Sequence, residues 1–85
     1  MRPVVWSTEA IEDLLTVARQ DVRQATRISE AVTRFSRDGS GDIKKLKGES
    51  KLWRIRVGDW RVFYEDQPGQ AIVVRVALRR DAYDD

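Results

Sequence analysis

The chain has 85 residues and a formal net charge of +2, and it contains neither cysteine nor histidine. A chain of this length supports one core, so we expect a single domain over residues 1–85. The composition excludes disulfides, thiolate metal sites and every Ser-His or Cys-His nucleophile pair. Because no apolar run is long enough for a membrane span or a secretory signal, the sequence predicts a cytoplasmic protein without a metal or cofactor.

The small net charge hides an uneven distribution along the chain. Residues 1–42 carry six basic and seven acidic side chains, whereas residues 43–80 carry ten basic and four acidic ones. Three aspartates among the last five residues bring the total back to +2. Since the positive charge is concentrated in the second half, the sequence indicates a polyanionic partner.

The first part of the chain predicts a short strand followed by a helix. Residues 3–6 are apolar and short, as in a strand that must pair with a later one. Ser7 is a suitable N-cap for a helix over residues 8–19. The apolar positions of this helix are Ile11, Leu14, Leu15 and Ala18.

A second helix begins directly after the first. Asp21 is its expected N-cap, Gln24 is placed to complete a capping box, and Gly39 supplies the stop. Its apolar stripe consists of Val22, Ala25, Ile28, Val32 and Phe35. Because so short a linker joins the two helices, we expect an antiparallel hairpin whose apolar stripes belong to the core.

Residues 52–76 predict three strands in a meander. Alternating apolar and polar residues mark the strands, in residues 52–57, 60–65 and 71–76. Gly58-Asp59 leaves only two residues for the first turn, and Pro68-Gly69 marks the second. The apolar face would carry Trp53, Ile55, Val57, Trp60, Val62, Tyr64, Ile72, Val74 and Val76.

The same alternation places arginines on the opposite face of the sheet. Arg54, Arg56 and Arg61 lie there, with Arg61 pointing into the middle, and Arg75 joins them from the third strand. Guanidinium groups in such a cluster repel one another unless an anion lies among them. A solvated arginine face is also common on small proteins, so the alternation alone leaves both interpretations open.

Further basic residues flank the strands in sequence. Lys45, Lys47 and Lys51 lie in a connector before the sheet, where they are either phosphate contacts or ordinary solubilising charge. Arg79 and Arg80 follow the last strand, and Tyr83 comes shortly after them. We expect these three residues near one edge of the arginine face, on a short C-terminal turn.

The residues described so far resemble the RelE/ParE superfamily of toxins from bacterial type II toxin–antitoxin pairs. The resemblance covers nearly the whole chain and rests on Leu-Lys-Gly at residues 46–48, the run at residues 53–65 and Arg-Arg-Asp-Ala-Tyr at residues 79–83. It implies an α+β fold, with two N-terminal helices packed on one face of a small four-stranded antiparallel sheet. The opposite, concave face would bind RNA, since RelE-type members cut messenger RNA in the ribosomal A site.

The resemblance also implies roles for individual residues. The catalytic set would be Arg54, Arg56, Arg61, Arg79 and Tyr83, with Arg61 as the phosphate-binding arginine and the last two as the C-terminal pair. The RNA-binding residues would be Lys45, Lys47, Lys51, Arg75 and Arg80.

Two departures from the family pattern weaken the acid-base chemistry. Leu78 stands where members often have histidine, and some members use a lysine as proton acceptor at the position of Arg54 or Arg56, where this chain has arginine. Arginine is almost never deprotonated in a protein, so these residues supply charge stabilisation and positioning rather than a base. We expect Tyr83 to stack on a base or orient the substrate, with proton transfer as the alternative role, and the ribosome or the RNA to supply the missing group.

The leading functional hypothesis is a toxin that cleaves messenger RNA on the ribosome and thereby inhibits translation. Its partners would be the ribosome with A-site messenger RNA and a cognate antitoxin with an acidic or helical segment lying across the helices or sheet. One alternative is a ParE-type inhibitor of DNA gyrase, which the absent histidine keeps open. Another is a catalytically inactive RNA-binding module, which needs only the positive face.

Overall fold

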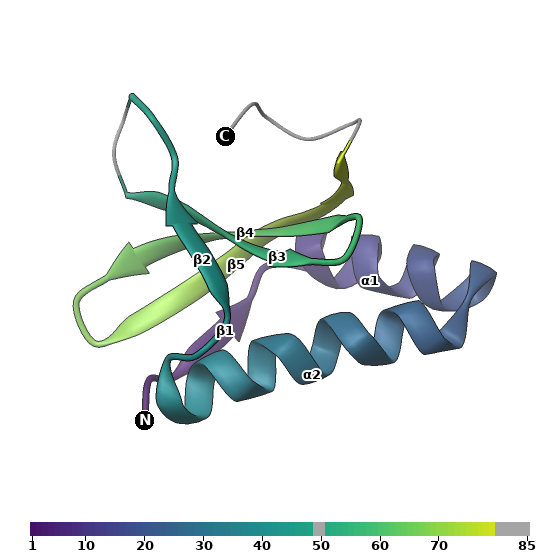
Figure 1. The fold of residues 1–85 in the computed structure, drawn as a ribbon, viewed down its shortest axis with the longest axis horizontal. Coiled ribbons are helices and arrows are strands. Elements are labelled where there is room, and N and C mark those ends of the chain that lie inside the picture. The colour runs from purple at the N-terminus through teal and green to yellow at the C-terminus, as the bar shows by residue number, and fades with distance from the viewer. Residues whose placement is uncertain (49–50, 80–85) are drawn as a thin grey trace.

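Two helices lie against one side of a five-stranded sheet in the computed structural model, which describes residues 1–48 and 51–79 (Figure 1). The elements in chain order are β1 (Val4–Trp6), α1 (Thr8–Gln20), α2 (Val22–Asp38), β2 (Asp42–Lys45), β3 (Leu52–Val57), β4 (Trp60–Gln67) and β5 (Gln70–Leu78). The expected α+β fold with two N-terminal helices on one face of a small sheet is confirmed. Among the described residues, no helix is long and apolar enough to cross a lipid bilayer.

The sheet has the strand order β1-β5-β4-β3-β2 and is mixed, so the expectation of four antiparallel strands was wrong in two details. The fifth strand is β2, which we expected to be part of the connector. It pairs antiparallel with β3, and Ile43 lies opposite Ile55. β1 pairs parallel with β5, because both strands start at the end of the sheet where the β4–β5 turn lies. Just before β1, Arg2 Nη2 donates to the carbonyls of Gln67 (3.0 Å) and Gln70 (3.1 Å) at this turn.

Side chains and one glycine set the limits of the helices. Ser7 Oγ accepts a hydrogen bond from the N–H of Ala10 (3.1 Å), as expected of an N-cap. Asp21 ends α1 by donating its N–H to Val17 (2.8 Å) and begins α2 by accepting from Arg23 and Gln24. Because this N–H is already used by α1, Gln24 does not complete the capping box. Gly39 ends α2 in the left-handed conformation (φ 75°), as expected.

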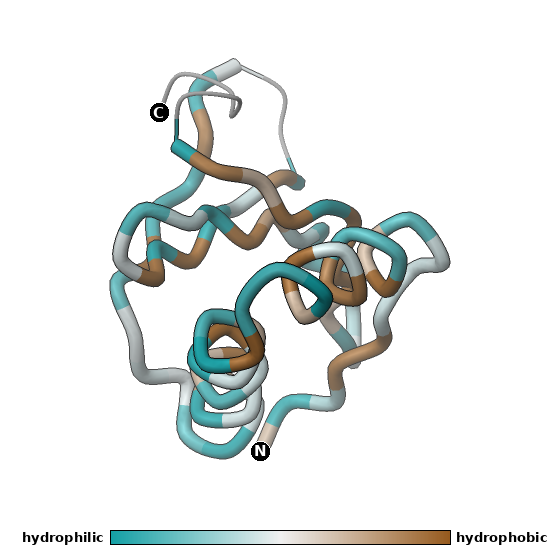
Figure 2. Tube along the Cα trace, turned by 90° about the vertical axis from the view of Figure 1, so that its right-hand side faces the viewer, coloured by the Kyte–Doolittle hydropathy of each residue, from teal (hydrophilic) through white to brown (hydrophobic). Residues whose placement is uncertain are grey.

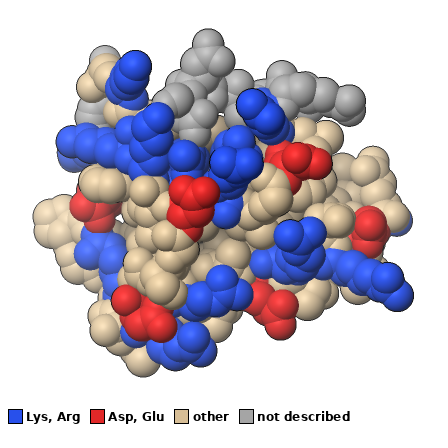
Figure 3. All heavy atoms as spheres, viewed as in Figure 1, with Lys and Arg blue, Asp and Glu red and all other residues tan. Residues whose placement is uncertain are grey.

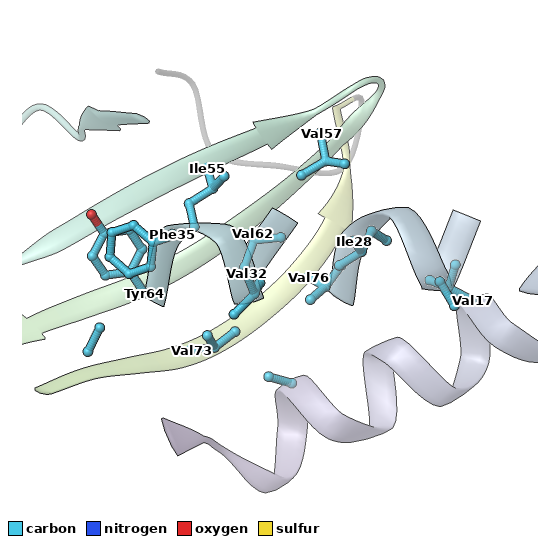
Figure 4. Packing of buried hydrophobic residues seen from close by; sticks show 13 residues of the cluster. Val17, Ile28, Val32, Phe35, Ile55, Val57, Val62, Tyr64, Val73 and Val76 are labelled. Carbon is cyan, nitrogen blue, oxygen red and sulfur yellow. The ribbon is translucent and has the colours of Figure 1, made fainter. Parts of the chain in front are cut away.

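The core lies between the helices and the sheet (Figure 4). From α2 it takes Ala25, Ile28, Val32 and Phe35, as the sequence predicts, but Val22 is 68% exposed. Ring contacts extend this core across the layers, since Tyr64 lies 4.8 Å from Phe35 and 6.4 Å from Trp53 between ring centroids.

The buried face of α1 differs from the one expected. Ala10 and Val17 are buried, whereas Ile11 and Leu15 are 46% and 50% exposed. α1 packs on both α2 and β5, so Leu14 and Ala18 of the expected stripe do pack against the core, while Ala10 and Val17 take the place of Ile11 and Leu15. Figure 2 shows hydrophobic stretches in both helices and in the strands around this core.

A β-bulge changes the phase of β5. Phe63 lies opposite Arg75 but Tyr64 lies opposite Val73, so Val74 is an extra residue on its strand. The core side of β5 is therefore formed by Ala71, Val73 and Val76, all buried, and the expectation that Ile72 and Val74 face the core was wrong. Simple alternation cannot reveal a bulge, because the sequence stays apolar on both sides of it.

Candidate functional site

The strand register gathers basic residues on the sheet face away from the helices. Arg54 lies opposite Phe63, and Arg56 lies opposite Arg61, on β3 and β4. Since partners across a sheet share a face, Arg54, Arg56 and Arg61 form one surface, which we call the arginine face. β2 adds Lys44, which lies opposite Arg54.

Arg54 is held in place by β2. Its Nη1 donates to the backbone carbonyl of Asp42 (2.9 Å) and to the carboxylate of the same residue (3.1 Å). The residue is only 8% exposed, so the charge is fixed before any ligand binds. A charge fixed in this way loses little freedom when an anion arrives, which is the property expected of a preorganised electrostatic site.

Arg61 lies on the arginine face, as predicted, but it is more buried than we expected. Its Nη1 donates to the carbonyls of Gly58 (3.3 Å) and Trp60 (3.2 Å), so the side chain folds back toward the β3–β4 turn. It is 6% exposed. Phe63 beside Arg54 is also buried, although it lies outside the helix-side core.

Arg75 does not join the arginine face, because α1 binds it. Its Nε and Nη2 donate to the two carboxylate oxygens of Asp13 (2.8 and 3.2 Å). The same carboxylate accepts the N–H of Val76 (2.8 Å) at the part of β5 beyond the β1 pairing. This contact between distant residues cannot be inferred from strand alternation.

The flanking residues are only partly brought to the arginine face. Lys45 lies opposite Trp53 and is exposed on the helix side of the sheet, whereas its neighbour Lys44 lies on the arginine face. Lys47 and Lys51 are exposed beside the β2–β3 connection. Alternation with the half-buried Ile43 would have identified Lys44, had residues 42–45 been recognised as a strand.

Arg79 follows β5 and is the last residue that the structure describes. This residue is exposed, and its backbone N–H donates to the carbonyl of Asp59 (2.7 Å) at the β3–β4 turn. Arg79 therefore lies at the same end of the sheet as Arg61. Arg80 and Tyr83 lie outside the described residues.

Sequence reasoning missed a second group of arginines, on α2. Arg27 and Arg34 line a cleft between α2 and β3, and Arg56 lines the same cleft from the sheet. Figure 3 shows Lys and Arg groups on this side of the molecule both over the strands and over α2. The seven-residue spacing of the two helix residues, two turns apart, was the available signal.

The described residues offer electrostatic stabilisation but no acid or base suited to neutral pH. Burial, with a smaller contribution from Asp66, raises the pKa of Tyr64 to about 12, against a lowering contribution from Arg2. Tyr64 therefore belongs to the core and not to the site. Within residues 1–48 and 51–79, no cluster of three acidic side chains is suited to holding a metal ion.

Comparison with known families identifies the chain. The family model of the ParE toxin of type II toxin–antitoxin systems, parDE, matches residues 4–83. The chain belongs to this toxin family. The resemblance to the RelE/ParE superfamily is thereby confirmed, and the basic sheet face described above is the face of a toxin.

One curated relative of the toxin is Toxin RelE3 from Methanocaldococcus jannaschii, which is 44% identical over 43 residues. The match covers 51% of this chain and 49% of that protein, so the chain spans about half the length of the curated relative that it matches.

Solved structures share the fold over most of the chain. The RelB-RelE antitoxin–toxin complex from Methanococcus jannaschii is 26% identical with a TM-score of 0.75, covering 94% of this chain and 99% of that one. The RelBE2 complex from Mycobacterium tuberculosis is 24% identical with a TM-score of 0.76 and covers 92% and 98%. The DinJ-YafQ complex from E. coli is 13% identical with a TM-score of 0.76 and covers 98% of each chain.

Proposed function

We propose that this toxin is an endoribonuclease that cleaves messenger RNA in the ribosomal A site and so inhibits translation. The observation that supports this most is the arginine face, where Arg54 and Arg61 are fixed by protein oxygens. Arg56 is exposed beside them on the same face. Three permanent positive charges on one surface suit a phosphodiester whose negative charge increases as it reacts.

The proposed reaction is attack of a ribose 2′-hydroxyl on the adjacent phosphorus. The bond from phosphorus to the 5′-oxygen of the next nucleotide breaks, which leaves a 2′,3′-cyclic phosphate and a free 5′-hydroxyl. The proton lost from the 2′-hydroxyl balances the proton gained by the leaving oxygen. Arg61 and Arg54 would stabilise the charge on the phosphoryl oxygens, with Arg79 beside them at the turn.

Proton transfer is the step that this chain supplies least well. The sequence has no histidine, and the arginines stay protonated. We therefore propose that the ribosome or the RNA provides the acid and base, and that Tyr83 stacks on or orients the substrate. On this basis the isolated toxin should cut naked RNA poorly and translated messenger RNA efficiently, because positioning by a large partner supplies much of the rate.

We also propose that the toxin is neutralised by a cognate antitoxin. The relatives of known structure named above are complexes of a toxin with an antitoxin. An acidic or helical segment would complement the basic surface. Co-expression with the product of the neighbouring reading frame should restore growth to cells that express the toxin, and a lack of protection would contradict the assignment of that partner.

Primer extension on messenger RNA from cells that express the toxin tests the nuclease. Discrete 5′ ends within codons are the expected result, and the same analysis with Arg61→Ala should show a strong loss of these ends. Intact messenger RNA accompanied by DNA-damage signalling would instead support the second candidate, a ParE-type inhibitor of DNA gyrase. That candidate is favoured by the parDE family match and by the absent histidine.

A further inference from the structure

A cleft of about 270 Å³ lies between α2 and the edge of the sheet at β3. β2 pairs with β3 only up to Arg56, so Val57 and Gly58 have no pairing partner on β2 at this edge. Ala31 and Ile55 are apolar residues that line it.

Arg27 and Arg34 of α2 line this cleft, and Arg56, which belongs to the arginine face, also lines it at the edge of β3. None of them forms a hydrogen bond or salt bridge in the structure of residues 1–48 and 51–79. Two acids also line the cleft, but the carboxylate of Asp42 is bound to Arg54 (3.1 Å). Glu30 is the other acid, so three arginines line the cleft with one carboxylate that is not bound to Arg54, and this excess of positive charge favours a bound anion.

The cleft and the arginine face meet at the β3–β4 turn. On the helix side, Arg27 packs against Gly58: a Cβ atom added to Gly58 would lie 3.3 Å from Arg27 Nη2. The φ of Gly58, 61°, also favours glycine at this position. On the other side, the carbonyl of Gly58 accepts from Arg61 Nη1 (3.3 Å). Arg27 of the cleft and Arg61 of the arginine face thus both lie beside Gly58, so one anionic chain can follow both basic surfaces.

We propose that the cleft of Arg27, Arg34 and Arg56 is a second phosphate site, which holds a backbone phosphate of the same RNA strand that lies on the arginine face. The proposal rests on the proposed function of that face. A planar guanidinium fork matches a phosphate, and contacts of this kind position a nucleic acid without reading its sequence. Continuity around the turn favours an RNA strand over a short acidic peptide, since a strand carries a charge at every nucleotide.

Binding of a labelled single-stranded 2′-O-methyl RNA, measured by fluorescence anisotropy at several salt concentrations, tests the site. This RNA lacks the attacking hydroxyl, so binding is measured without cleavage. Arg27→Ala and Arg34→Ala should each weaken binding and reduce the slope of log affinity against log salt by about 0.7, the value for one phosphate contact on a single strand. Glu30→Gln should strengthen binding, because it removes a negative charge from the same cleft.

Arg23→Ala is the matched control, since Arg23 is an exposed arginine one turn before Arg27 on α2 but does not line the cleft. This variant should keep nearly the wild-type slope. Unchanged slopes in both cleft variants, or equal losses in all three arginine variants, would overturn the second phosphate site, as would failure of the wild-type protein to bind this RNA at low salt. Loss of antitoxin binding with RNA binding intact would also overturn it and would assign the cleft to an acidic protein segment.

The outcomes separate this inference from the proposed nuclease. A wild-type toxin that binds the 2′-O-methyl RNA through the cleft but leaves messenger RNA intact in cells would contradict the nuclease alone. A toxin that cleaves messenger RNA while both cleft variants keep the wild-type salt slope would contradict the cleft alone.

Discussion

The two faces of the sheet bury side chains for different reasons. On the helix side, Val62 and Ile55 are buried among apolar groups of α2 and stabilise the fold by removing apolar surface from water. On the opposite face, Arg54 and Arg61 are nearly as buried but are held by backbone carbonyls and one carboxylate. Burial on the helix side thus depends on how well apolar side chains fill the core. Burial on the arginine face depends on protein oxygen atoms that accept hydrogen bonds from the guanidinium groups.

The largest expected effect comes from Arg61→Ala, which removes one charge from the arginine face. Ribosome-dependent cleavage should fall by roughly a hundredfold or more, the loss typical of one transition-state charge stabiliser. The free energy of unfolding should fall by about 1–3 kcal/mol, because the substitution removes hydrogen bonds to the carbonyls of Gly58 and Trp60 from a side chain that is 6% exposed. Cleavage rate and melting temperature on the same preparation provide the measurement.

Arg61→Lys is the matched control for that change. It keeps the charge but loses the planar fork, so its cleavage rate should lie between those of the wild-type and Arg61→Ala proteins. An alanine variant that cleaves at full rate would show that this residue serves the turn and not the reaction.

Val62→Ala should produce the opposite pattern. Val62 is fully buried on the helix side, so the substitution should cost about 1–3 kcal/mol of unfolding free energy while sparing cleavage by the protein that remains folded. Urea unfolding followed by tryptophan fluorescence measures the loss. Val5→Ala is the control: Val5 is 48% exposed on β1, and its loss should stay within about 0.5 kcal/mol. Similar losses for the two variants would refute the distinction between the faces.

A smaller effect is expected where α1 reaches the edge of β5. Asp13→Ala removes the carboxylate that accepts from Arg75 and from the N–H of Val76, and should cost about 1–2 kcal/mol of unfolding free energy. Cleavage should be unaffected, because this contact lies apart from the arginine face. The exposed neighbour Glu12 is the control, and Glu12→Ala should leave the urea midpoint nearly unchanged. Equal urea midpoints for Asp13→Ala and Glu12→Ala would contradict the prediction, because they would mean that water replaces the Asp13 carboxylate without any loss of unfolding free energy.

The smallest effect concerns alkaline pH. The folded-state pKa of Tyr64 is raised to about 12 from an ordinary value near 10, chiefly by burial. The unfolded chain therefore loses this proton first, so the contribution of Tyr64 to stability is complete below about pH 10 and declines between about pH 10 and pH 12. Ultraviolet titration of phenolate should show this delayed ionisation, and Tyr64→Phe should remove both the late phase and its share of the pH dependence. A phenolate formed near pH 10 in the folded protein would contradict the buried position.

Local signals were sufficient for much of the fold. Ser7, Asp21 and Gly39 marked the helix limits, because each acts on backbone groups within a few residues. Gly58-Asp59 and Pro68-Gly69 marked turns in which the glycines take φ values of 61° and 82°. The arginine face followed from alternation within β3 and β4, whose two-residue connection fixes their register.

The sequence by itself therefore determined the described helices and strands other than β2, the turns, the family and the side of the sheet on which Arg54, Arg56 and Arg61 lie. Only the tertiary structure decided that Arg75 binds Asp13, that Val74 is a bulge, and that Arg27, Arg34 and Arg56 line one cleft. The physical reason is range. Caps and turns depend on neighbours in sequence. A guanidinium instead binds an oxygen that is close in space, and the packing of helices against strands determines which oxygen or which cleft lies beside it.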